Sequence, residues 1–274
     1  MLNLQVHILS LRNVGGYSQI VSIIPAGDKR LPVYEAGQHA TFVRQPDGAE
    51  KTFSMASSPA ETQTGGYLEF YISADVTPQP DGVEGIHFFF NPETAGEFYH
   101  LREIGGSFTL NEQVTGYRHI VMVATGSGLA PFRSMIRALS ERPARGRTGL
   151  DRMSLLYGHR TIEELAYYPD ITSIEREKTF DFFALPTVTR RTEGLTAHPD
   201  IPVGRVVGFL AEALSSRTAG VKSTDNSHEA PMRRFSQRMK LETTLLMVCG
   251  NPGMVEEVHR LAAMHGIHCV SEEW

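Results

Sequence analysis

Residues 119–139 read HIVMVATGSGLAPFRSMIRAL, and they contain the pattern from which the fold can be predicted. Its first part, Ile120 to Ala124, is an unbroken apolar run, which is typical of a strand buried on both faces of a parallel sheet. Small residues follow at 125–128, and apolar residues then recur at helical spacing as far as Leu139. The pattern therefore predicts a strand, a glycine turn and a helix. The N–H groups and helix dipole at such a turn suit a phosphate or pyrophosphate, although a turn without a ligand explains TGSG alone equally well.

Length and composition are those of a globular protein with room for two domains. The chain has 274 residues, of which 41% are hydrophobic and 21% are charged. A net charge of −5 argues against nucleic acid as the main partner, because that binding needs an excess of Lys and Arg. No stretch approaches the length of a membrane span and no signal peptide is recognisable, so we expect a cytoplasmic protein with no membrane partner. We also expect a monomer. Two cysteines are too few for a zinc site or an iron–sulfur cluster, so no metal is expected and any electron must travel on an organic cofactor.

The first 110 residues alternate short strands with turn residues. The pattern predicts a small antiparallel β-barrel with strands at 17–24, 40–45, 51–56, 67–73 and 98–110. The irregular stretch from Thr77 to Gly96 is expected to form a loop and one short helix.

From about Gly116, strands alternate with helices. Strands are predicted at 120–124, 153–157, 180–185, 245–249 and 267–270. Helices are expected to begin at Leu129, at Thr161 with a capping box to Glu164, at Arg205, and at Pro252 after the N-cap Asn251. This order predicts an α/β domain with a doubly wound, parallel, five-stranded sheet. The predicted domains are thus a barrel at 1–115 and an α/β domain at 116–274, with a polar insertion at 217–242 that we expect to be mobile.

Three motifs in this order resemble the ferredoxin–NADP⁺ reductase family, and the bacterial ferredoxin or flavodoxin reductases in particular. They are KTFSMASSP at 51–59, TGSGLAPFRS at 125–134 and CGNPGM at 249–254, and the resemblance covers nearly the whole chain. It implies an FAD-dependent oxidoreductase that exchanges electrons between NADP(H) and ferredoxin or flavodoxin. In such enzymes, hydride transfer to the flavin is followed by single-electron steps.

The resemblance assigns the first motif to FAD. Lys51 takes the place of an arginine on the diphosphate, Phe53 that of the ring that carries the flavin, and Ser54 that of the hydroxyl near its reactive nitrogen. Lysine lacks the bidentate fork of arginine, and phenylalanine lacks the hydroxyl of the usual tyrosine. The residues that follow along the flavin edge are Met55, Ala56 and Ser57. The family's phosphate-binding hydroxyl is replaced by GIHF at 85–88, and KTFS by itself is more typical of an ordinary alternating strand than of a flavin site.

The resemblance assigns the other two motifs to the nicotinamide nucleotide. The turn is formed by Thr125, Gly126 and Gly128, and Gly250 follows Cys249, whose thiol abuts the carbon that transfers hydride. The expected catalytic residues are therefore Ser54 and Cys249, although a buried cysteine is more often a core residue. Three arginines at strand ends correspond to the site of the adenosine 2′-phosphate and favour NADP(H) over NAD(H): Arg160, Arg190 and Arg205. A solvated surface is the alternative for each of them alone.

Two further features bear on function. Trp274, the last residue, is expected either to stack on the flavin as a gate for nicotinamide or to hold the adenine of FAD. Basic residues at 142–152 and 233–240 form either a docking surface for an acidic carrier or ordinary solvated surface. Two other functions stay open: an NAD(P)H flavin reductase that uses diffusible flavin, and a non-catalytic electron-docking or regulatory subunit.

Overall fold

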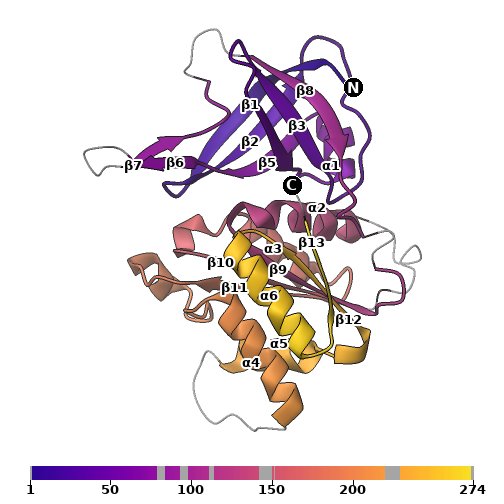
Figure 1. Cartoon of the computed structure of the whole chain (residues 1–274), viewed down its shortest axis with the longest axis vertical. Coiled ribbons are helices and arrows are strands. Elements are labelled where there is room, and N and C mark those ends of the chain that lie inside the picture. The colour runs from indigo at the N-terminus through magenta and orange to yellow at the C-terminus, as the bar shows by residue number, and fades with distance from the viewer. Residues whose placement is uncertain are drawn as a thin grey trace. The chain divides into compact units, whose positions relative to one another are not determined.

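The computed structural model describes residues 2–78, 84–92, 98–110, 114–141, 150, 152–219 and 229–272 (Figure 1). Trp274 and the basic stretch 142–149 lie outside the described residues. The chain divides into two compact units, one with residues 1–110 and 130–141 and the other with residues 111–129 and 142–273. The helix that follows the glycine turn therefore packs with the N-terminal unit, although its sequence neighbours belong to the second.

The first unit contains a six-stranded antiparallel sheet with the strand order β4-β3-β8-β1-β2-β5. Its strands are β1 Leu4–Val14, β2 Ser18–Pro25, β3 His39–Gln45, β4 Glu50–Ser54, β5 Leu68–Ser73 and β8 Phe98–Gly105. A bridge between Met55 and Phe70 connects the two edge strands, so the sheet closes into the predicted barrel. Aromatic side chains fill its interior, where the fully buried rings of Phe42 and Phe70 meet edge to face at 5.3 Å between centroids.

Three parts of this unit differ from the prediction. Strand β1 was not predicted, and neither was the two-turn helix α1, Pro59–Gly65, whose capping box joins Ser58 and Glu61. In the stretch 77–96, where a loop and a short helix were expected, the described residues contain no helix. Instead, β6 Asp75–Pro78 pairs with β7 Glu84–His87 in a separate two-stranded ribbon (Figure 1).

The second unit contains the predicted parallel five-stranded sheet, in the order β11-β10-β9-β12-β13. Its strands are β9 His119–Thr125, β10 Arg152–His159, β11 Phe182–Val188, β12 Thr244–Cys249 and β13 His268–Ser271. The helices of the chain beyond the barrel are α2 Leu129–Ser140, α3 Tyr168–Glu177, α4 Val206–Ala219, α5 Glu229–Arg238 and α6 Pro252–Met264. Helices α4, α5 and α6 share one apolar core with β9, β10, β11 and β12. As predicted, Asn251 caps α6, because its side chain accepts a hydrogen bond from Met254 N at 3.3 Å.

Two expectations for this unit are wrong. Thr161 does not begin an α-helix: only a 3₁₀ turn follows, and the Glu164 carboxylate accepts from Arg160 N at 3.2 Å instead of completing a capping box. Of the predicted mobile insertion at 217–242, residues 220–228 lie outside the described residues, and residues 229–242 are not a loose insertion. Helix α5 lies among them, and its apolar side chains are buried in the core of the unit at Met232 and Phe235. The polar composition of the segment hid this narrow apolar stripe.

Candidate functional site

Ser54 lies at the end of β4 and is buried, with 4% of its surface exposed. Directly opposite on β3 is His39, and two residues further along the same face the hydroxyls of Thr41 and Thr52 are 2.9 Å apart. Burial lowers the pKa of His39, while the charge of Glu103 opposes that shift. His39 is thus the imidazole nearest in register to Ser54. Sequence reasoning missed it, because strand pairing cannot be read from either motif.

Lys51 and Phe53 occupy the other face of β4. The Phe53 ring is half-buried and packs against Phe89 and Phe90, at 5.5 and 5.6 Å between centroids. Its predicted stacking face is therefore shared with an aromatic cluster of the barrel. Phe89 and Phe90 follow directly after the stretch 85–88, whose role was left open.

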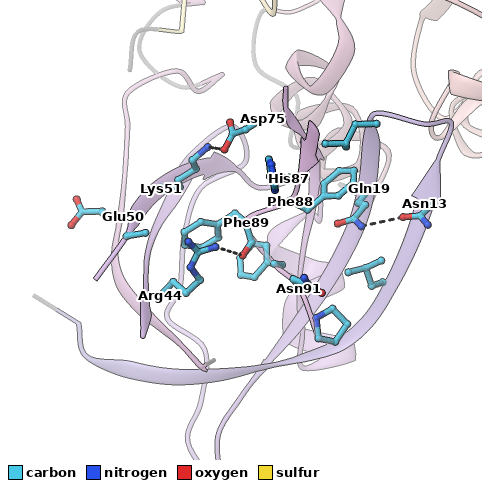
Figure 2. A pocket seen from close by; sticks show the side chains of 15 residues that line it. Asn13, Gln19, Arg44, Glu50, Lys51, Asp75, His87, Phe88, Phe89 and Asn91 are labelled. Atoms are coloured by element: carbon cyan, nitrogen blue, oxygen red, sulfur yellow. Dashed lines mark hydrogen bonds and ion pairs between the residues drawn. The ribbon is translucent and has the colours of Figure 1, made fainter. Parts of the chain in front are cut away.

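A cavity of about 570 Å³ opens beside Lys51 (Figure 2). Side chains from β3, β4, the β6–β7 ribbon and the following segment line it, among them Arg44, Lys51, Asp75, His87 and Phe88. The structure thus brings Lys51 and residues 86–88 of the stretch GIHF together at one cavity. Arg44 was not predicted, because nothing in its sequence surroundings marks it.

The cations of this cavity have acidic partners. The Lys51 ammonium forms an ion pair with Asp75, which lines the same cavity (Figure 2). The Arg44 guanidinium pairs with Asp47, with 2.6 Å between Nη2 and Oδ2, and the hydrogen bonds from Arg44 lower the pKa of that carboxyl. The wall of the cavity is therefore polar and close to charge balance.

The segment that follows Ser54 is held by helix α2. Arg133, with 8% of its side chain exposed, donates to Ala56 O at 2.9 Å and forms a bidentate ion pair with Glu61 at 2.6 and 2.9 Å. Ser134 Oγ donates to Ser57 O at 2.7 Å. Burial alone would raise the pKa of Glu61, but the hydrogen bonds and charge of Arg133 outweigh it and lower that pKa. Two consecutive residues expected along the flavin edge are thus fixed by a buried, charged contact that the motif alone did not reveal.

In the second unit, the two nucleotide motifs touch each other at the carboxyl ends of β9 and β12. A Cβ on Gly128 would lie 2.3 Å from Cys249 O, and one on Gly250 would lie 2.4 Å from Thr125 Oγ1. Gly250 also has a φ of 139°, which side-chain-bearing residues rarely adopt. Asn251 N donates to Thr125 Oγ1 at 3.1 Å. Glycine is required at both positions because the two turns are in direct contact.

Cys249 is buried at the end of β12, and its thiol donates to Glu272 Oε2 at 3.1 Å. Burial raises the pKa of Cys249 well above its usual value, and the Glu272 carboxylate raises it further. The thiol is therefore protonated at neutral pH and is not a nucleophile. Glu272 was not predicted, since no motif surrounds it.

The three arginines assigned to the 2′-phosphate follow neighbouring parts of the sheet. Arg160 and Arg190 come after β10 and β11, and their backbones meet through a hydrogen bond from Arg190 N to Arg160 O at 2.7 Å. Arg205 follows Val203, which pairs with Val188 at the end of β11. Its side chain is 67% exposed and forms an ion pair with Glu257 at 3.4 Å. All three therefore lie at the carboxyl edge of the sheet.

His159 lies at the same edge and was not predicted. Its ring forms a hydrogen bond with the backbone of Gly126 in the glycine turn, and burial, together with the charge of Arg160, lowers its pKa to about 4. The imidazole is therefore neutral at physiological pH. An uncharged hydrogen-bonding group thus supports the turn from the neighbouring strand.

Some of the basic residues considered for a docking surface already form ion pairs within the protein. On α5, Arg234 pairs with Glu175 at 3.1 Å and Arg238 pairs with Asp181 at 2.6 Å, while Arg233 and Lys240 are exposed. Within the described ranges, no three His, Cys, Asp or Glu side chains are grouped to hold a metal. No helix of the described part is long and apolar enough to cross a membrane.

The oxidoreductase NAD-binding domain model matches residues 122–260, half of the chain. The chain belongs to this family. The match contains both nucleotide motifs and all three arginines of the sheet edge. Membership makes this protein an oxidoreductase with a nicotinamide-nucleotide-binding domain.

Comparison with related proteins confirms the predicted resemblance. This chain is 24% identical over 234 residues to the flavodoxin/ferredoxin–NADP reductase of Escherichia coli, and the alignment covers 82% of this chain and 77% of that protein. It is 22% identical over 236 residues to NADH-cytochrome b5 reductase 1 of Eremothecium gossypii, with 86% and 69% covered. Its fold matches a ferredoxin NADP⁺ reductase from Neisseria gonorrhoeae with bound FAD and NADP, with a TM-score of 0.65, 18% identity and 97% of each chain covered. The two-domain fold class predicted from the sequence is thereby confirmed.

Proposed function

We propose that this oxidoreductase binds FAD and exchanges electrons between NADP(H) and a ferredoxin or flavodoxin. The observation that carries the proposal is the contact between the TGSG and CGNP turns, with the Cys249 thiol beside them. This arrangement presents a glycine turn, a helix start and a small uncharged side chain at one sheet edge, which suits a nicotinamide nucleotide. The ferredoxin and flavodoxin reductases of Escherichia coli and Azotobacter vinelandii are among its relatives, which supports the choice of acceptor.

The residues of the barrel fit FAD. When bound, FAD accepts hydride and releases electrons singly. Lys51 and Arg44 supply positive charge for the diphosphate at the cavity, and the half-buried Phe53 supplies an apolar surface for the ring system. Ser54 offers a hydroxyl at the end of β4, and His39 opposite it is a group able to hold or release a proton. Arg133 and Ser134 fix the backbone that follows, so the site is held rigidly.

We further propose that the nucleotide is NADP(H) and not NAD(H). An adenosine 2′-phosphate carries two negative charges, and Arg160, Arg190 and Arg205 concentrate positive charge at the carboxyl edge of the second unit's sheet. Relatives of this chain are named for both NADH and NADP, so the arginines carry this choice.

The test is a purified preparation with three readouts. We expect flavin absorbance after desalting, NADPH oxidation with an artificial acceptor, and NADPH-dependent reduction of ferredoxin or flavodoxin. A colourless protein that oxidises NADPH only when free flavin is added would identify a flavin reductase instead. A protein that does not oxidise NADPH with any of these acceptors, whether or not flavin is added, would be the non-catalytic subunit.

A further inference from the structure

We propose that Asp75 weakens the hold of the barrel cavity on FAD, because it neutralises the lysine that faces the diphosphate. The inference rests on the proposed function, which assigns the FAD diphosphate to Lys51. It concerns how firmly the cofactor is kept: with Asp75 present, FAD dissociates more readily than it would without this carboxylate.

The first step is the ion pair itself. The Lys51 ammonium and the Asp75 carboxylate are paired, and both side chains line the same cavity (Figure 2). Lysine carries its charge on a single nitrogen, whereas arginine presents two edges and can bind a carboxylate and a phosphate together. A carboxylate next to Lys51 therefore offsets the single charge of that nitrogen and occupies one of its three donors, which weakens its attraction for a phosphate.

The second step concerns the other charges of the cavity. Arg44 is occupied by Asp47, which accepts three hydrogen bonds from its Nε and Nη2. Glu50 adds another carboxylate to the wall and pairs with Arg102. Both basic side chains of the lining, Arg44 and Lys51, are thus already paired with a carboxylate, and the partner of Lys51 is Asp75, whereas that of Glu50 is Arg102. A diphosphate that enters this site has to share Lys51 with Asp75.

The third step is the size of the effect. The side chains of Lys51 and Asp75 are 38% and 55% exposed, so water screens their attraction and the pair can open. Removal of the Asp75 charge is therefore expected to lower the FAD dissociation constant by about twofold to fivefold, the upper part of the range typical of exposed ion pairs. The change is a gain of affinity, which damage to the fold does not produce.

The experiment measures FAD binding to flavin-free full-length protein by fluorescence titration, together with the rate of FAD release. The variants are Asp75→Asn, Lys51→Met, the double variant, and Glu50→Gln as a matched control that removes one negative charge from the same cavity. We expect tighter binding and slower release in Asp75→Asn, a change of less than about twofold in Glu50→Gln, and no gain from Asp75→Asn in the Lys51→Met background. Riboflavin, which has no phosphate, should bind to wild type and Asp75→Asn alike.

Several outcomes would overturn the inference. Unchanged or weaker FAD binding in Asp75→Asn, while wild type binds FAD, contradicts the inference alone and leaves the proposed function standing. An equal gain in Glu50→Gln, or a gain that persists without Lys51, would show a general charge effect instead of competition for one ammonium. Failure of every variant to bind FAD would overturn the proposed function, and this inference with it.

Discussion

The thiol of Cys249 and the carboxylate of Glu272 are joined by a hydrogen bond, with 3.1 Å between Sγ and Oε2. Cys249 is the last residue of β12 and Glu272 directly follows β13, and these two parallel strands are neighbours, since Val248 pairs with Ser271. Burial and this carboxylate both raise the pKa of Cys249, so the thiol stays protonated. A neutral side chain of fixed orientation is what alignment of a hydride donor requires.

We therefore predict that Cys249→Ser slows reduction of the flavin by NADPH by about tenfold or more, because near-attack geometry is lost, while FAD stays bound. Stopped-flow absorbance at saturating NADPH measures the limiting rate. Cys269→Ser changes the other cysteine, which is partly buried, and should leave the rate unchanged. A limiting rate equal to that of wild type would make Cys249 an ordinary core residue.

Nucleotide preference should depend on Arg160 and Arg190. We expect Arg160→Ala or Arg190→Ala to weaken NADPH binding by about tenfold or more and to leave NADH nearly unchanged, because each charged hydrogen bond to phosphate contributes about 1.5–3 kcal/mol. The measurement is kcat/KM for both nucleotides. Arg176→Ala, on the exposed last turn of α3, is the control. Equal kcat/KM values for NADPH and NADH in wild type would contradict the assignment.

The pair of Arg133 and Glu61 should be a major source of stability. Arg133→Met would leave the Glu61 carboxylate buried without its main partner, which typically costs about 3–5 kcal/mol. Arg137 also contacts Glu61, but its side chain is 30% exposed and makes one hydrogen bond there at 3.2 Å, so Arg137→Met should cost far less. Urea unfolding gives both free energies. Equal losses in the two variants would show that the bidentate geometry is unimportant.

The lowered pKa of the buried His119 should make the stability of the protein depend on pH. Its ring is 2% exposed and lies between Ser154, 3.0 Å from Nε2, and Thr244, 3.4 Å from Nδ1. Burial lowers its pKa to about 3, with smaller contributions from the charges of Arg238 and Arg152. The unfolded chain therefore binds the proton more readily than the folded one. Stability falls as the pH drops below the unfolded pKa of about 6.5, and the fall ends near the folded pKa.

We expect this histidine alone to cost about 2 kcal/mol of unfolding free energy between about pH 7 and about pH 5. Other groups titrate in the same range, so the comparison is between wild type and His119→Gln. The variant should be less stable at neutral pH, yet its stability should fall less on acidification. Parallel pH profiles for the two proteins would refute the assignment.

The pattern of apolar residues was enough to predict most of the fold, because the central strands of the parallel sheet are buried on both faces. All six residues of β12 are buried, and the last five, 245–249, form the unbroken apolar run from which the strand was predicted. Strand β1 has buried residues only at Leu4, Val6 and Val14, and a bulge near Leu9 breaks its alternation. Its pattern was therefore too weak to recognise from the sequence.

In the candidate site too, some residues could be predicted from the sequence and others could not. The glycine turns were predictable because close backbone contact permits no other residue at Gly128 and Gly250. Glu272 and Arg133 were not, because their partners lie 23 and 72 residues away and only the folded chain brings them together. Short motifs reveal residues whose role is set by local backbone geometry. Residues that act through distant contacts need the structure.

Helix α2 has a consequence for how such chains are divided or recombined. Its sequence continues from the nucleotide-binding turn, but its contacts are with the barrel. A barrel fragment that ends at residue 115 would lose the hydrogen bonds that α2 makes to Ala56, Ser57 and Glu61, at about 1–3 kcal/mol for each buried group left unpaired. A chimera that replaces the C-terminal half at a single crossover would combine the barrel of one protein with the α2 of another, and the contacts between the two would not be complementary. The two structural units of this protein are therefore interleaved along the sequence. A chimera that keeps α2 with its own barrel needs a second crossover, placed after residue 141.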